Sequence, residues 1–139
     1  RCPHFFHVAR NRFEDHLLMP VVYRILGQVV PSNSFVTLYQ TPISPVSQYS
    51  SRRVKRAIVS NITLSHAELF TTRYYTIRVV PSGETGGVQH EIFSGAGIVA
   101  GATHFLSIGI TLDKGDSVEV KMGDTDAKVS FSAFGSEIF

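Results

Sequence analysis

The sequence predicts an all-β fold, an antiparallel β-sandwich or jelly roll of about eight short strands with an extended N-terminal arm. Three observations support this prediction. From residue 21 onward, short segments alternate apolar with polar residues, which is the period of a half-buried strand. Clusters of Gly, Pro, Asn, Asp and Ser separate these segments at regular intervals. Beyond residue 20, no segment repeats its apolar residues with the period of a helix.

The first half of the predicted sandwich contains four strands. A run of apolar residues ends before the turn-forming residues Pro31–Ser34, and the next alternating segment ends at a loop rich in proline and serine. In the third segment Ile58, Ile62 and Leu64 share one alternation, so we expect all three to face the core. The fourth alternates Ile and Val with Thr and Arg, which indicates one solvent-facing side. The predicted strands are Val21–Val30, Phe35–Thr41, Arg53–Leu64 and Tyr74–Val80.

The second half contains four more predicted strands. A glycine-rich turn precedes the first of them, which is short. The second places Leu106, Ile108 and Ile110 on one side, opposite small residues. Tight turns of Asp and Gly bound the third, and the fourth alternates apolar residues with Lys and Ser. These strands are Val88–Phe93, Thr103–Leu112, Ser117–Met122 and Lys128–Phe134.

Length and composition indicate one ordinary folded domain. The chain has 139 residues, of which 43% are hydrophobic and 17% charged, and a chain of this size can bury a core without disulfides or a structural metal. The single cysteine, Cys2, excludes an internal disulfide and a cysteine-rich zinc site. The longest apolar runs, such as Gly95–Ala102, fall short of the roughly 20 residues of a membrane span. We therefore expect no membrane partner.

The N-terminal residues differ in composition from the rest of the chain. Residues 1–18 contain three of the six histidines and three phenylalanines, and they lack glycine. We therefore expect two parts, an arm over residues 1–20 and a β-sandwich domain over residues 21–139. The arm either remains after processing of a longer precursor or is translated upstream sequence before a natural start at Met19. Its apolar side chains are candidate partner contacts: Phe5, Phe6, Phe13, Leu17 and Leu18.

Charge is distributed unevenly along the chain. Residues 1–56 carry eight Arg or Lys against two acidic residues, a balance of +6, whereas residues 57–139 carry a balance of −4. An acidic second half argues against nucleic-acid binding and favours contacts between copies or with a differently charged partner. A basic cluster supplies further candidate contacts: Arg52, Arg53, Lys55 and Arg56. The cluster could also be a processing site or touch phosphate, although cations that guard a strand edge explain it most simply.

The candidate catalytic motifs are incomplete. His90 and Glu91 begin like a zinc-protease helix, but Ser94 occupies the position of the second histidine. The glycines at 95, 97 and 101 are spaced one residue too far apart for a dinucleotide-binding loop and indicate a loop or bulge. A G-x-S-x-G nucleophile motif is absent from the sequence. We therefore expect no enzymatic activity, catalytic residue, metal or cofactor.

Two sets of residues keep binding alternatives open. Four aspartates could gather around calcium at one end of a sandwich, although they are also ordinary turn residues: Asp113, Asp116, Asp124 and Asp126. Four tyrosines could form an aromatic platform that binds carbohydrate: Tyr39, Tyr49, Tyr74 and Tyr75.

From about Tyr23 to Phe139, the sequence resembles a group of small structural proteins of tailed bacteriophages. Each matching piece alone is ordinary strand-and-turn sequence, and together they occur in the same order over most of the chain. The pieces are Ile25–Gln28, Thr37–Pro42, Ala57–Ile62, Ile77–Gly83, Leu106–Leu112 and Ser132–Ile138. Residues 1–18 and the loop Ser44–Ser51 depart from the pattern.

The resemblance implies a non-enzymatic component of the virion. It implies a capsid decoration or cement protein that binds the outside of the head and bridges neighbouring capsid subunits. Its partners would be the major capsid protein and further copies of the chain, with trimers as a common arrangement for such proteins. The alternative is an accessory β-domain of the tail or neck that could bind host-surface carbohydrate. The group has no catalytic residues to carry over to this sequence.

Overall fold

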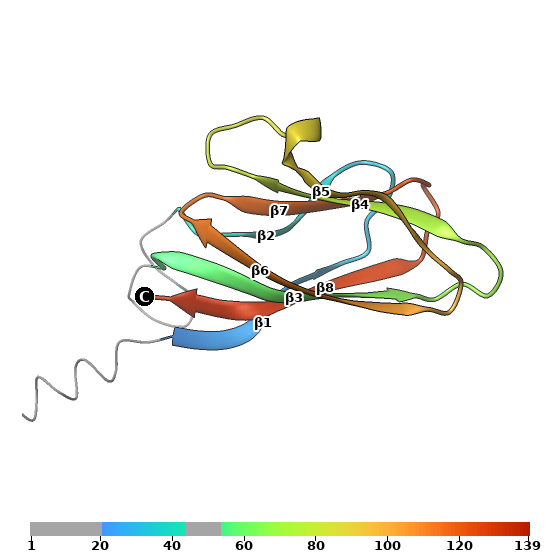
Figure 1. Cartoon of the computed structure of the whole chain (residues 1–139), viewed down its shortest axis with the longest axis horizontal. Helices are drawn as coiled ribbons and strands as arrows, with labels where there is room; N and C mark the ends of the chain where they lie inside the picture. Colours follow the sequence, from blue (N-terminus) through green and yellow to red (C-terminus); the bar gives the residue numbers. More distant parts are fainter. Residues whose placement is uncertain (1–20, 44–53) are drawn as a thin grey trace, which may run out of the picture.

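Eight strands in two antiparallel sheets make up the described part of the chain, residues 21–43 and 54–139, in a computed structural model (Figure 1). The first sheet has the order β1-β8-β3-β6 and the second has the order β2-β7-β4-β5. A single-turn 3-10 helix, η1 (Val88–His90), precedes β5. The strands are β1 (Val21–Val29), β2 (Val36–Gln40), β3 (Arg56–His66), β4 (Arg73–Val80), β5 (Glu91–Ile98), β6 (Thr103–Asp113), β7 (Ser117–Met122) and β8 (Val129–Ile138).

The strand pairing is that of a jelly roll. Strand β1 pairs with β8, β2 with β7, β3 with β6 and β4 with β5, so the first strand pairs with the last and the pairing continues inward. A long antiparallel ribbon paired in this way and wrapped into two facing sheets is a jelly roll. The predicted all-β sandwich is therefore confirmed, whereas the predicted arm, residues 1–20, lies outside the described residues.

The core lies between the two sheets and is built by the apolar alternation of their strands. Phe131 from the first sheet and Tyr75 from the second meet edge to face, with their ring centroids 6.0 Å apart. Leu106, Ile108 and Ile110 pack against this core on one side of β6, as their spacing predicts. The fully buried apolar side chains include Val59, Ile62, Leu64, Ile77, Ile98, Leu112, Val118, Val120 and Val129.

One face prediction is wrong in β3. Ile62 and Leu64 are buried as expected, but Ile58 points to the outer face, because the pairing of β3 with β8 shifts between Val59 and Asn61. The extra residue, Ser60, forms a β-bulge. Even-numbered residues face outward before the bulge and inward after it. Ala57 and Val59 are therefore the inward residues before the bulge.

The bounds of several strands also differ from the prediction. Strand β3 spans Arg56–His66 rather than Arg53–Leu64, and β5 and β8 differ at their ends. Val88 belongs to η1 rather than to a strand, and the strand that follows runs to Ile98 through Gly95, which adopts a positive φ of 64°. Strand β8 continues to Ile138, past the predicted end at Phe134. Within the described residues, no helix is long and apolar enough to cross a membrane.

Candidate functional site

Apolar side chains gather on the outer face of the first sheet at its β1 edge. Val21, Tyr23 and Ile25 alternate outward along β1, and Tyr23 is 80% exposed. Ile25 pairs across the strands with Phe134 of β8, which is also exposed. We call these four residues the β1–β8 surface. A contiguous exposed apolar patch of this kind is typical of an interaction site.

A hollow of about 450 Å³ indents the β1–β8 surface. Tyr23, Ile25 and Phe134 line it together with Ser60. Two bulges meet at this hollow. The pairing of β8 with β1 shifts next to Ile25, and the pairing of β8 with β3 shifts next to Asn61. Both Ile25 and Asn61 pair with Phe134. Bulges redirect side chains and increase the local twist of a sheet. The hollow is thus a product of the backbone pairing around Phe134.

Glycine is required beside this hollow. Gly135 packs so closely on β3 that a Cβ atom would collide with the backbone carbonyl oxygen of Ile58. The same holds on the neighbouring strand, where a Cβ at Gly27 would collide with the carbonyl oxygen of Leu38. Close backbone approach is a common reason for glycine within a strand.

A buried carboxylate, Glu137 of β8, connects β1 to the second sheet on the inner side of the β1 edge. Glu137 is 1% exposed and accepts hydrogen bonds from Arg24 Nε at 2.8 Å and Arg24 Nη2 at 3.1 Å. The Tyr39 hydroxyl of β2, in the other sheet, donates to the second Glu137 oxygen at 2.6 Å. Burial and the adjacent carboxylate raise the pKa of Tyr39 well above its usual range. The cluster joins both sheets and fixes the strand that carries Tyr23 and Ile25.

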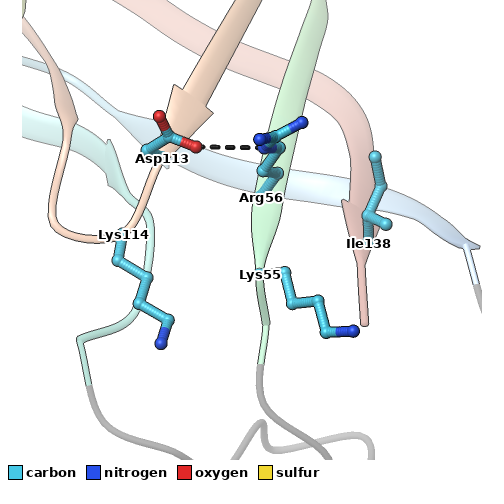
Figure 2. A pocket seen from close by; sticks show the side chains of 5 residues that line it. All are labelled: Lys55, Arg56, Asp113, Lys114 and Ile138. Carbon is cyan, nitrogen blue, oxygen red and sulfur yellow. Dashed lines mark hydrogen bonds and ion pairs between the residues drawn. The ribbon is translucent and has the colours of Figure 1, made fainter.

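Most of the contact residues predicted from the sequence lie outside the described residues. These are Phe5, Phe6, Phe13, Leu17, Leu18, Arg52 and Arg53. The structure places Lys55 immediately before β3 and Arg56 at its first position, both exposed. Arg56 forms an ion pair with Asp113 of β6 at 3.1 Å. Figure 2 shows both cations beside a hollow of about 490 Å³, which Lys114 and Ile138 also line.

The four aspartates do not gather at one place. Asp113 ends β6 and Asp116 immediately precedes β7, and the Asp116 carboxylate accepts backbone N–H bonds from Asp113 and Ser82. Asp124 and Asp126 follow β7 at its other end and both contact Arg73. The calcium alternative is therefore wrong, because one strand length separates the two pairs.

The four tyrosines do not form one platform either. Tyr39 and Tyr75 are buried between the sheets, Tyr74 is exposed on the second sheet, and Tyr49 lies outside the described residues. Adjacent strand residues point to opposite faces, so Tyr74 and Tyr75 cannot share a surface within regular pairing. The exposed tyrosine of the β1–β8 surface, Tyr23, was not singled out from the sequence. Apolar residues occupy both the odd and the even positions of its strand, so the alternation there does not distinguish the outer face from the inner one.

Comparisons with known proteins give one structural similarity. A chain in the structure of infectious bursal disease virus, Gx strain, aligns with a TM-score of 0.44 and 14% sequence identity. The alignment covers 85% of the present chain and 30% of that chain. No protein-family model and no curated protein matches the sequence. The sequence resemblance to bacteriophage structural proteins therefore gains no support from these comparisons.

Proposed function

We propose that this protein is a non-enzymatic structural component of a virion, a decoration or cement protein that binds the outside of the capsid. In this role the β1–β8 surface contacts the major capsid protein, and copies of the chain bridge neighbouring capsid subunits. The observation that carries the proposal is the exposure of Val21, Tyr23, Ile25 and Phe134 on one sheet face. A partner that covers them removes apolar surface from water, which favours association.

The stiffness of the site supports a binding role. Glu137 ties β1 to the opposite sheet through Arg24 and Tyr39. A surface held in one geometry loses little conformational entropy when it binds, so more of the contact energy appears as affinity. A cement protein has to transmit load between subunits, and two sheets joined through their interior suit that task.

Two broader observations are consistent with a virion role. The jelly roll occurs in viral capsid domains, and also in lectins and cupins. Fold alone does not determine function, so this is an analogy. The ordered sequence resemblance to small bacteriophage proteins points to the same role, and from it we propose a tailed bacteriophage as the source of the capsid.

We propose the absence of catalysis from what the described histidines do. The Glu68 backbone N–H donates to His66 Nδ1, which leaves Nε2 to donate to the Thr71 carbonyl at 2.6 Å. His90 accepts a hydrogen bond from the Gly87 N–H through Nδ1. His104 Nδ1 lies 3.2 Å from the hydroxyl of Tyr75, whose side chain is buried in the core. The contacts of His66 and His90 hold turns in place, and we propose that none of the three rings activates a nucleophile.

Mass spectrometry of separated heads and tails tests the location. The experiment uses purified particles of the virus that encodes the chain and measures the copy number in each fraction. We expect many copies on heads and few or none on tails. Detection in tails or necks alone would replace the cement role with that of an accessory domain, and absence from both fractions would refute a virion role.

A binding assay on purified capsids tests the surface. We expect Tyr23→Ser combined with Ile25→Ser to weaken capsid binding by about 10- to 100-fold, because buried aromatic and aliphatic anchors dominate interface energies. The control is Val88→Ser, which removes an equally exposed apolar side chain from η1, away from this surface. Equal binding by the double variant and the control would exclude the β1–β8 surface from the contact.

A further inference from the structure

Besides the β1–β8 surface, a second group of exposed apolar side chains lies on the loop between β3 and β4, at the end of the sandwich far from the C-terminus (Figure 1). The loop between β3 and β4 carries Leu69 and Phe70 at its tip, which are 78% and 93% exposed. Figure 1 shows this loop at the end far from the C-terminus. Two large apolar side chains presented together to water indicate a contact site rather than a structural requirement of the loop.

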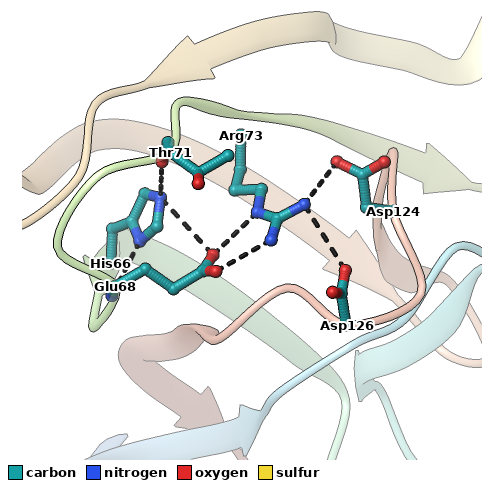
Figure 3. A network of polar contacts seen from close by, with 6 residues as sticks. All are labelled: His66, Glu68, Thr71, Arg73, Asp124 and Asp126. Carbon is teal, nitrogen blue, oxygen red and sulfur yellow. Dashed lines mark hydrogen bonds and ion pairs between the residues drawn. The ribbon is translucent and has the colours of Figure 1, made fainter.

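The base of this loop is held by a polar network, which Figure 3 shows. Arg73 donates to both carboxylate oxygens of Glu68, at 2.7 Å and 2.8 Å, and so closes the loop across its tip. Arg73 also donates to Asp124 at 2.8 Å, which joins the loop to the turn between β7 and β8. His66 adds a second closure through its bond to the Thr71 carbonyl. The network lowers the pKa of Glu68 and keeps this carboxylate ionised.

The tip therefore has a fixed shape and an acidic rim. The exposed carboxylates of Asp124 and Asp126 contact the base of the loop through Arg73. Among the described residues, Lys128 adds one exposed positive charge beside the loop. Arg73 pairs with Glu68 and also with Asp124 and Asp126, so three carboxylates share one guanidinium and the rim stays negative even with Lys128 counted. A partner suited to this tip has an apolar recess with positive charges at its edge.

The chain carries such a recess at the other end of β3. The hollow of Figure 2 has an apolar wall at Ile138 and three exposed cations, Lys55, Arg56 and Lys114, against one acid, Asp113. Its volume of about 490 Å³ lies within the range of pockets that take a drug-sized group, so it has room for apolar side chains. Because β3 has 11 residues, its two ends, one beside the hollow and the other at the start of the loop, lie about 33 Å apart.

We propose that the Leu69–Phe70 tip of one copy docks into the Lys55–Lys114–Ile138 hollow of a second copy. The apolar tip fills the recess while Asp124 and Asp126 face the lysines. The two contact sites are different surfaces at opposite ends of one chain, so the contact is head-to-tail and each copy can bind two others. Such contacts close into a ring or continue as a filament. This self-association does not depend on the proposed virion role.

Sedimentation velocity on the full chain tests the proposal. We expect the wild-type protein to sediment faster as concentration rises, and added salt to weaken this by screening the charges. Phe70→Ser should weaken self-association by about 10- to 150-fold, the effect of losing one buried aromatic side chain. Lys55→Glu combined with Lys114→Glu should also weaken it, because the new carboxylates repel the acidic rim. Val88→Ser is the control and should associate like the wild type.

A mixing experiment distinguishes a head-to-tail contact from a symmetric one. The Phe70→Ser variant keeps an intact hollow, and the Lys55→Glu/Lys114→Glu variant keeps an intact tip. At a concentration at which the wild type associates and each variant alone is monomeric, an equimolar mixture should form dimers and nothing larger, since only one productive contact exists. A wild-type chain that stays monomeric at about 1 mM, or a mixture that forms no dimer, would overturn the proposal.

Discussion

Replacement of the buried carboxylate of Glu137 is the sharpest test of how the two sheets are held together. Glu137→Gln keeps the size of the side chain and removes its charge. The Arg24–Glu137 ion pair is then lost, with the Arg24 side chain 19% exposed, and Tyr39 keeps an oxygen acceptor only if the amide adopts the right orientation. Removal of one member of a buried ion pair costs about 3–5 kcal/mol, and the partial exposure of Arg24 lowers our expectation to about 2–4 kcal/mol.

Urea denaturation measures this loss of unfolding free energy. For an m value of about 2 kcal/mol/M, the midpoint should fall by about 1–2 M. The matched control is Asp113→Asn, which breaks an ion pair of similar length between exposed side chains and should change stability by less than about 1 kcal/mol. A Glu137→Gln variant within about 0.5 kcal/mol of the wild type would refute the assignment of Glu137 as the clamp between the sheets.

Two further predictions concern the same region. The pKa of Tyr39 is raised in the folded state, so its contribution to stability is complete below about pH 10, the unfolded value, and is lost as pH rises further. Urea midpoints from about pH 8 to pH 11 should therefore fall less steeply for Tyr39→Phe than for the wild type, and parallel curves would count against a raised pKa. Gly135→Ala should destabilise the protein by about 1–3 kcal/mol through collision with the Ile58 carbonyl, whereas Gly109→Ala, which meets nothing within 4 Å, should be close to neutral. Thermal melting compares the two, and equal melting temperatures would contradict the steric argument.

Strands with strict alternation were predictable from the sequence nearly to the residue. Ser117–Met122 has the same bounds in the sequence prediction and in the structure, because Val, Glu and Lys alternate there between two clear turns. Val88 shows the limit of this reasoning. It follows a glycine-rich turn and opens a segment that ends in Ile92 and Phe93, which predicts a strand, but the hydrogen bonds between Gly87 and His90 close a 3-10 turn around it.

The outward orientation of Ile58 was not predictable in the same way. Ile58 and Ile62 are four residues apart, so regular alternation would place them on the same face. Only the bulge at Ser60 puts them on opposite faces. That bulge depends on the close approach of Gly135 from a strand about 75 residues later in the chain. The hollow beside Phe134 depends on the same long-range pairing, so its residues carry no local signal in the sequence that marks them out.

The sequence by itself determined the fold class, most of the strands and the turns between them, because alternation and turn chemistry act over a few neighbouring residues. The tertiary structure decided which strands pair and which side chains meet. Glu137 meets Arg24 across 113 positions and Tyr39 across 98, and the Leu69–Phe70 tip lies at the opposite end of β3 from the basic hollow. Such meetings depend on how the ribbon of paired strands wraps into two sheets, which is a property of the whole chain rather than of any segment.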